Sequence, residues 1–293
     1  MSSSVKPSQQ PYYYVPDKSV NTILGTFALL FMALGATFLL NNMPWGLPFA
    51  LVGLFMIITM TWLWFADVIR EGLQGLNSSR VAASFRWGVW WFIFSEVMFF
   101  LALFMALFYV RLVGLGDLGT AEAEEYLWKW YGTEFTSHWP LVGATNYIPS
   151  FSPVSAFGIP AINTAVLLAS GVTLTLSHNA IYDENRRFAL FWLALTIILG
   201  LVFVTAQAIE YYHAVDHSGL LLSSGVYGSL FYFLTGFHGF HVSIGCIMLI
   251  VVWFRMMKGH LTVKNHFSFE AIAWYWHFVD VVWLMLFVSV YWL

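Results

Sequence analysis

Long apolar runs alternate with short polar segments along most of the chain. Seven of these runs reach the roughly 20 residues that a helix needs to cross the hydrocarbon core of a bilayer. The runs occupy residues 21–40, 47–66, 82–110, 159–177, 188–209, 225–254 and 267–293. Lipid offers the backbone no hydrogen-bond partners, so each run is predicted to form a helix. The pattern therefore predicts an all-α membrane protein with seven transmembrane helices.

The composition supports this class and excludes several others. Only 9% of the 293 residues are charged and 60% are hydrophobic, whereas soluble domains carry about 25% charged residues. The net charge of −3 argues against a nucleic-acid partner. Cys246 is the one cysteine, so an intrachain disulfide and a cluster of thiolate metal ligands are both excluded.

The basic residues predict how the helices are oriented. Ten of the twelve Lys and Arg residues fall on one side of the predicted membrane, namely Lys6, Lys18, Arg70, Arg80, Arg86, Arg186, Arg187, Arg255, Lys258 and Lys264. The other two, Arg111 and Lys129, fall on the opposite side. Loops rich in basic residues stay on the cytoplasmic side, so we expect the N-terminus inside and the C-terminus outside.

The spans and loops define the predicted organisation of the chain. A polar N-terminal tail covers residues 1–20, the first two helices cover 21–66, an inner loop covers 67–81, and the other five helices cover 82–293. This last part includes a long outer loop, 112–158, with the acidic stretch GLGDLGTAEAEEYLWKWYG. We interpret it as an exposed, partly ordered loop. The alternative is a docking surface for a basic partner such as a soluble electron carrier.

One carboxylate interrupts the apolar run WFIFSEVMFF, residues 91–100. Glu96 lies near the middle of the third predicted span, with no charged residue within a helical turn. Desolvation disfavours the charged form of an isolated carboxyl, so we expect Glu96 to be protonated. The side chain either handles protons or bonds to a neighbouring helix for packing, and the sequence leaves both readings open.

Two further pairs of polar residues lie inside predicted spans. His238 and His241 are three residues apart and share a helix face. They suit metal or haem ligands, or a pair of neutral imidazoles that bond across helices, and we favour the second interpretation. His277 and Asp280 have the same spacing and can pair locally. We expect these four residues to form a structural polar seam.

The end of the fifth span carries Glu210, His213 and His217. The Glu-x-x-His spacing resembles half of a di-metal carboxylate site, but the sequence has a single copy. We therefore predict no metal here.

A cluster of basic residues and histidines lies at the inner edge of the predicted membrane, with Trp62 and Trp64 at interface depth. Its members are Arg70, Arg255, Lys258, His260 and His266. Such a cluster suits lipid phosphates, and the alternative is ordinary flanking by snorkelling side chains.

Several motifs resemble subunit III of cytochrome c oxidase, the haem–copper respiratory oxidase. They are DVIREG, SEVMFF, NTAVLLASGVTLT, GVYGSLFYFLTGFHGFHV and FEAIAWYWHFVDVVWLMLFVSVYW, in the family's order between Trp62 and Leu293. The resemblance implies seven helices, with helices 1–2 and helices 3–7 forming a V-shaped bundle that holds phospholipids. It implies no redox centre in this chain, with haem and copper in partner subunits. It also implies that the chain packs on subunit I, in a complex with subunit II, and supports proton uptake and sustained turnover.

The resemblance assigns roles residue by residue. Glu96 corresponds to the buried glutamate of the third helix in the family. The implied lipid-binding residues are Trp64, Arg70, Glu71, Arg255, Lys258 and His266. The seam residues His238, His241, His277 and Asp280 match the TGFHGFH and WHFVD motifs. Leu76 and Asn77 stand where mitochondrial members carry histidines, which weakens that part of the lipid site. The outer loop is longer than in those members, which favours a bacterial member, located in the inner (cell) membrane.

Three other functions compete with this reading. A subunit III of a quinol oxidase is the first, although such members often lack the first two helices, which this chain has. A bis-histidine membrane cytochrome would use His178, His238 or His277 as haem ligands. A proton-coupled transporter would use Glu96 as its carrier site, but nothing in the sequence indicates a substrate.

Overall fold

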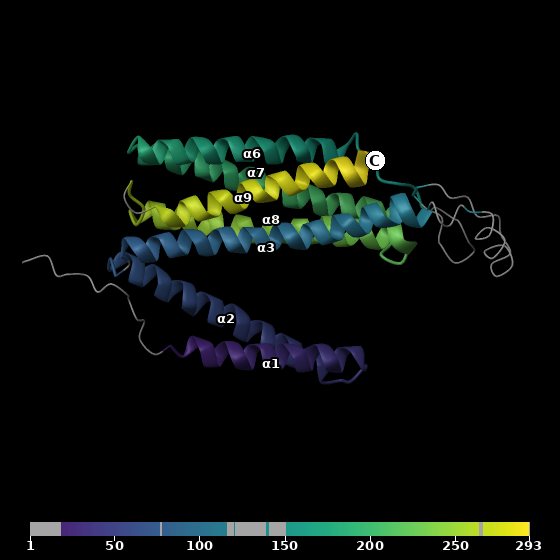
Figure 1. The fold of residues 1–293 in the computed structure, drawn as a ribbon, viewed down its shortest axis with the longest axis horizontal. Coiled ribbons are helices and arrows are strands. Elements are labelled where there is room, and N and C mark those ends of the chain that lie inside the picture. The colour runs from purple at the N-terminus through teal and green to yellow at the C-terminus, as the bar shows by residue number, and fades with distance from the viewer. Residues whose placement is uncertain are drawn as a thin grey trace, which may run out of the picture. The chain divides into compact units, whose positions relative to one another are not determined.

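The computed structural model describes residues 19–76, 78–115, 120, 139–140, 151–263 and 266–292. Seven helices in these residues are long and apolar enough to cross a membrane, which confirms the predicted fold class. They are α1 (Asn21–Leu40), α2 (Gly46–Leu73), α3 (Ser79–Tyr109), α6 (Ile159–Tyr182), α7 (Arg186–Asp216), α8 (Gly225–Met257) and α9 (Phe267–Leu286), labelled in Figure 1. The π-helical turns η1 (Val110–Gly114) and η2 (Phe287–Trp292) continue α3 and α9.

Some predictions fall on residues outside this description. Most of the outer loop 112–158 is among them, together with the N-terminal tail up to residue 18. The residues Lys6, Lys18, Asn77, Lys129 and Lys264 also lie outside the described ranges.

Five of the seven helices are longer than the apolar runs that predicted them. The second run ends at residue 66, but α2 continues through Asp67, Arg70 and Glu71 to Leu73. The fifth run covers 188–209, whereas α7 extends from Arg186 to Asp216. An apolar run measures the part of a helix that lies in hydrocarbon. Polar residues at its ends remain helical because the backbone hydrogen bonds simply continue.

The chain divides into two compact units, Met1–Gly88 and Val89–Leu293, each described by itself. In the first unit α1 and α2 pack closely through glycines. A Cβ added to Gly53 would lie 2.6 Å from the backbone nitrogen of Met32, and one added to Gly35 would meet the backbone of Ala50. Small residues of this kind let membrane helices approach at backbone distance. The V-shaped arrangement concerns both units together, and it stays a prediction.

In the second unit, α6, α7, α8 and α9 run side by side (Figure 1). Each packs on the next along the chain, and α9 also packs on α6, so the four helices enclose a core. Phe203 of α7 and Trp283 of α9 meet in this core edge to face, with ring centroids 4.7 Å apart. The part of α3 after Gly88 adds buried Phe100 and Phe104 to the same cluster. The outward side chains are largely apolar, as lipid contact requires.

Candidate functional site

Glu96 does not stand alone: it meets His241, on a helix far away in sequence. Its Oε2 atom, on α3, lies 2.8 Å from Nε2 of His241 on α8. The other ring nitrogen of His241, Nδ1, lies 2.6 Å from the carbonyl oxygen of Phe237. A carbonyl can only accept, so Nδ1 carries a hydrogen and donates it. Nε2 then either accepts a proton from a neutral Glu96 or, in the imidazolium, donates to its carboxylate.

The Glu96–His241 contact therefore holds a single proton between two atoms, and the pair as a whole carries no net charge in either arrangement. The sequence predicted a protonated carboxyl from its apparent isolation. The structure supplies a partner that keeps the site neutral even if the proton resides on the imidazole. This matters in hydrocarbon, where an unbalanced charge is costly.

Aromatic rings surround the imidazole of His241. Phe100 contacts it edge to face at a centroid distance of 5.1 Å, and the ring of Tyr275 stacks over it at 6.4 Å. The hydroxyl of Tyr275 also donates to the carbonyl oxygen of His241, at 3.2 Å. These contacts fix the ring plane, so Nε2 stays directed at Glu96.

His238 is directed at a different helix. Its Nε2 atom lies 3.3 Å from the carbonyl oxygen of Val279 in α9, and so carries the hydrogen. Its ring packs against Trp283 and Phe203, at centroid distances of 5.0 and 5.5 Å. Although His238 and His241 share a helix face by spacing, the structure gives their Nε2 atoms separate partners. Each imidazole thus contacts a group on another helix, and the structural role of the pair stays a prediction.

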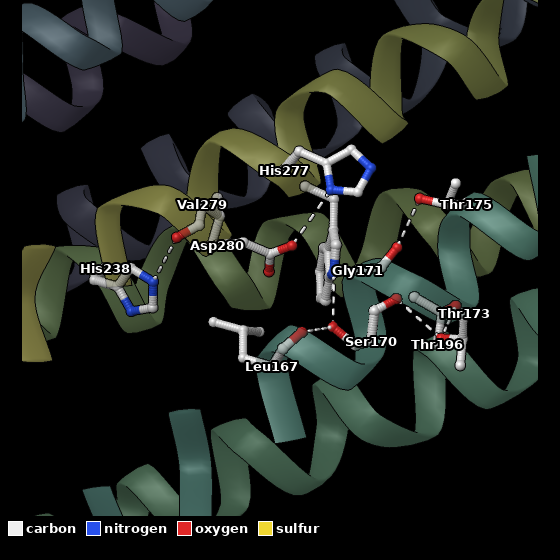
Figure 2. A network of polar contacts seen from close by, with 11 residues as sticks. Leu167, Ser170, Gly171, Thr173, Thr175, Thr196, His238, His277, Val279 and Asp280 are labelled. Carbon is white, nitrogen blue, oxygen red and sulfur yellow. Dashed lines mark hydrogen bonds and ion pairs between the residues drawn. The ribbon is translucent and has the colours of Figure 1, made fainter. Parts of the chain in front are cut away.

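His277 and Asp280 form a second close pair, drawn in Figure 2. His277 Nδ1 lies 3.4 Å from Asp280 Oδ2, with side chains 46% and 9% exposed. The carboxyl of Asp280 fits against α6 because residue 171 there is glycine. A Cβ at Gly171 would lie 2.5 Å from Asp280 Oδ2. His277 thus lies at the surface of α9, and Asp280 lies in the contact between α9 and α6.

Hydroxyl groups of α6 bond to α9 and to α7 near this pair (Figure 2). The indole nitrogen of Trp276 donates to Ser170 Oγ at 2.9 Å. Thr173 and Thr196 bond through their hydroxyls at 2.8 Å, which joins α6 to α7. Sequence reasoning missed these residues, because Ser and Thr are common in transmembrane helices and nothing local marks which of them face a partner.

The three residues with the Glu-x-x-His spacing lie in different surroundings. Glu210 is buried and accepts a hydrogen bond from the hydroxyl of Tyr291, at 2.6 Å. His213 and His217 are exposed, with ring centroids 5.2 Å apart. In the described ranges, no group of three or more His, Cys, Asp or Glu side chains has the geometry to hold a metal ion.

The implied lipid-binding residues fall into both units. Trp64, Arg70 and Glu71 lie on α2 in the first unit, where Arg70 pairs with Asp67 at 3.4 Å. The other three lie in the second unit, at the end of α8 and the start of α9.

The three residues of the second unit differ in how far they are already bonded. Arg255 donates to Ser268 Oγ at 2.8 Å, and His266 Nε2 lies 3.3 Å from the Tyr182 hydroxyl. Lys258 follows the last residue of α8 and is exposed. The side chain of Lys258 therefore extends from the end of α8 toward the surroundings.

Comparisons with known proteins extend the likeness over nearly the whole chain. The family described as cytochrome c oxidase subunit III matches residues 10–293. A cytochrome c oxidase subunit 3 from Cyprinus carpio is 41% identical over 270 residues, which cover 92% of both chains. One from Cyanidium caldarium is 38% identical over 282 residues, covering 96% of this chain and 94% of its own. One from Marchantia polymorpha is 40% identical over 275 residues, covering 94% and 93%. The similarity thus includes the first span, which the motifs did not reach.

Proposed function

Because the chain belongs to the cytochrome c oxidase subunit III family, we propose that it stabilises the catalytic subunit I, binds phospholipid and supports proton uptake by the complex. It is a multi-pass membrane protein and a non-redox subunit of a cytochrome c oxidase complex. The complex transfers electrons from cytochrome c to dioxygen and pumps protons. Haem and copper belong to partner subunits, and we expect subunits I and II to be those partners.

The Glu96–His241 pair is the observation that most supports a role in proton supply. Glu96 Oε2 and His241 Nε2 lie 2.8 Å apart inside a transmembrane bundle and share a single proton. Intramembrane ionisable groups that are retained despite their cost mark proton or structural functions. The pair can exchange its proton internally without creating net charge, which suits a group that buffers proton delivery.

Removal of the chain from the purified oxidase tests this role. We expect the remaining complex to reduce dioxygen at first and then to lose activity during turnover faster than the intact enzyme. Adding the subunit back should restore the lifetime. The purified subunit should show no haem absorbance. Equal lifetimes with and without the subunit would contradict a role in sustained turnover.

Lipid binding is proposed from the chemistry of Arg70, Lys258 and their neighbours. Cationic side chains at helix ends attract lipid phosphates, and Trp64 suits the headgroup depth. Lys258 is the most direct test, because it is exposed whereas Arg255 already bonds to Ser268. We expect Lys258→Ala to lower the phospholipid that copurifies with the complex, measured by mass spectrometry, and Lys258→Arg to retain it. Unchanged lipid content in Lys258→Ala would remove this residue from the lipid site.

We also propose that the chain is of bacterial type and lies in the bacterial cell membrane. The support is the long outer loop 112–158. The location of the gene, on a bacterial chromosome or in an organelle genome, decides this point.

The alternative function, as subunit III of a quinol oxidase, differs from the proposed one in the electron donor of the complex. Chains that copurify with this one should include a subunit II with a copper-binding motif, which indicates cytochrome c as donor. A copurifying subunit II without that motif would indicate a quinol.

A further inference from the structure

A second buried polar cluster lies in the bundle, away from the seam and from Glu96. Glu210, on α7, is 2% exposed. One of its oxygens, Oε1, accepts from the hydroxyl of Tyr291. The other, Oε2, bonds to nothing in the described part of the chain. One turn earlier on the same helix, Gln207 is 5% exposed. Its amide lies near the hydroxyls of Tyr211 and Tyr291 but forms no well-aligned hydrogen bond within the described residues.

Asn163 of α6 is a second buried amide. It is 1% exposed, and within the described ranges its Nδ2 and Oδ1 atoms both lack a hydrogen-bond partner. Two contacts set the antiparallel alignment of α6 and α7. Thr173 bonds to Thr196, and Ser177 Oγ donates to the carbonyl oxygen of Ala189 at 2.8 Å. Asn163 lies ten residues before Thr173, which places it along the helix axis near the residues of α7 that directly precede Gln207.

Contacts with α9 independently place the amides of Asn163 and Gln207 within about one helical turn of each other along the bundle. Trp283 donates from its indole nitrogen to Thr164 Oγ1, at 2.9 Å, and the same ring meets Phe203 of α7. Asn163 directly precedes Thr164, and Gln207 lies one turn beyond Phe203. Tyr291, two turns beyond Trp283, reaches Glu210. Asn163, Gln207 and Glu210 therefore follow one another along about two turns of the bundle interior, with Gln207 between the other two.

Buried amide and carboxyl groups in folded proteins are bonded either to protein or to ordered water. We propose that Asn163, Gln207 and Glu210 bind a small cluster of internal water molecules. The donor set selects water over a metal ion. Each amide presents two N–H donors beside its oxygen acceptor, and a cation would satisfy the oxygens and leave the donors unpaired. Water donates and accepts, and sites of this polarity are where internal water is found in proteins.

The walls of the cluster isolate it from the surroundings. Thr235 of α8 donates to the carbonyl oxygen of Phe231, so the hydroxyl of Tyr211 donates to Thr235 Oγ1, at 2.7 Å, and its oxygen can still accept. The buried rings of Phe231 and Tyr227 continue this side of the core. The proposed waters thus add to the one direct bond described for these three side chains, from Tyr291 to Glu210, and link α6 to α7 as well.

A density map of the intact oxidase, at a resolution that shows ordered water, tests the proposal. We expect at least one density peak within hydrogen-bond distance of Gln207 and of either Asn163 or Glu210. Gln207→Leu preserves bulk and removes the amide, and it should lose that peak. Gln74→Leu is the matched control, because Gln74 is exposed at the end of α2. It should leave the peak in place.

Three results would overturn the proposal. The amides of Asn163 and Gln207 bonded directly to each other would leave no room for water. An empty cavity beside these side chains would also contradict bound water. A peak that contacts only oxygen atoms, at the short distances of a bound cation, would indicate a metal ion in place of water. The map of the unmodified complex decides among these even if Gln207→Leu fails to assemble.

Discussion

At the scale of single residues, the hydrogen-bond inventory of each imidazole decides what it does. His241 bonds through Nδ1 to the backbone of its own helix and through Nε2 to Glu96. His238 bonds through Nε2 to the carbonyl oxygen of Val279. The two side chains come from one short motif and one helix face, yet they join α8 to two different helices. The motif therefore works as a junction of three helices.

Substitution of Glu96 and His241 tests the shared proton. Glu96→Gln should be close to neutral for stability, because the new amide donates to Nε2 of a neutral His241 as the protonated carboxyl does. His241→Leu should destabilise the complex by about 1–3 kcal/mol, since it leaves the Glu96 carboxyl without this partner. The measurement is the thermal unfolding of the detergent-solubilised complex.

The double substitution of Glu96 and His241 to Leu supplies the control. It removes both polar groups and should cost less than the sum of the two single Leu substitutions. Additive losses would mean that the two side chains do not act as a pair.

At the scale of helices, close packing is set by where glycine stands. Gly171 allows α6 to receive the carboxyl of Asp280, and Gly245 of α8 receives the ring of Trp276, 2.8 Å from where a Cβ would lie. In the first unit, Gly35 and Gly53 bring α1 and α2 together in the same manner. Because apolar side chains gain nothing by leaving lipid for one another, shape and hydrogen bonds decide how these helices associate.

Gly171→Ala should loosen the α6–α9 contact. The added methyl lies 2.5 Å from Asp280 Oδ2 and 3.5 Å from His277 Nδ1, so one group must move. We expect a loss of stability of about 1–3 kcal/mol, the usual cost of overpacking, measured by thermal unfolding of the complex.

A matched glycine on α8 provides the control for Gly171. A Cβ at Gly239 would meet only Gln207 Cγ, at 4.0 Å, so Gly239→Ala should be neutral or stabilising by up to about 1 kcal/mol. Asp280→Ala in the Gly171→Ala background should recover part of the loss. Equal effects of the two glycine substitutions would show that packing against Asp280 is not the cause.

At the scale of the whole molecule, the placement of basic residues predicts the direction in which the seven helices cross the membrane. Arg186 donates to the carbonyl oxygen of Met257 and so joins the start of α7 to the end of α8. Both ends belong to the side that the positive-inside rule assigns to the cytoplasm. The structure thus groups basic side chains at one end of this helix pair, while the orientation itself is a prediction.

Single cysteines test the orientation. Cys246 is buried, and Cys246→Ala gives a background without other thiols. Lys258 and His217 are exposed and lie at opposite ends of the bundle. In intact cells, a membrane-impermeant maleimide added from outside should label His217→Cys and leave Lys258→Cys unlabelled until the cells are opened. The reverse pattern would place the N-terminus outside.

The sequence alone determined the seven spans, although not where their helices end, and the family. It could do so because the thickness of the hydrocarbon core and the cost of unpaired backbone groups act on continuous stretches of chain. Only the tertiary structure decided the partners: His241 for Glu96, 145 residues away, and Tyr291 for Glu210, 81 residues away. Helical periodicity fixes which face carries a polar group, but nearly every face of a buried helix is apolar, so nothing local selects the neighbour. That choice depends on how glycines and aromatic rings set the register between helices, which is a property of the packed bundle.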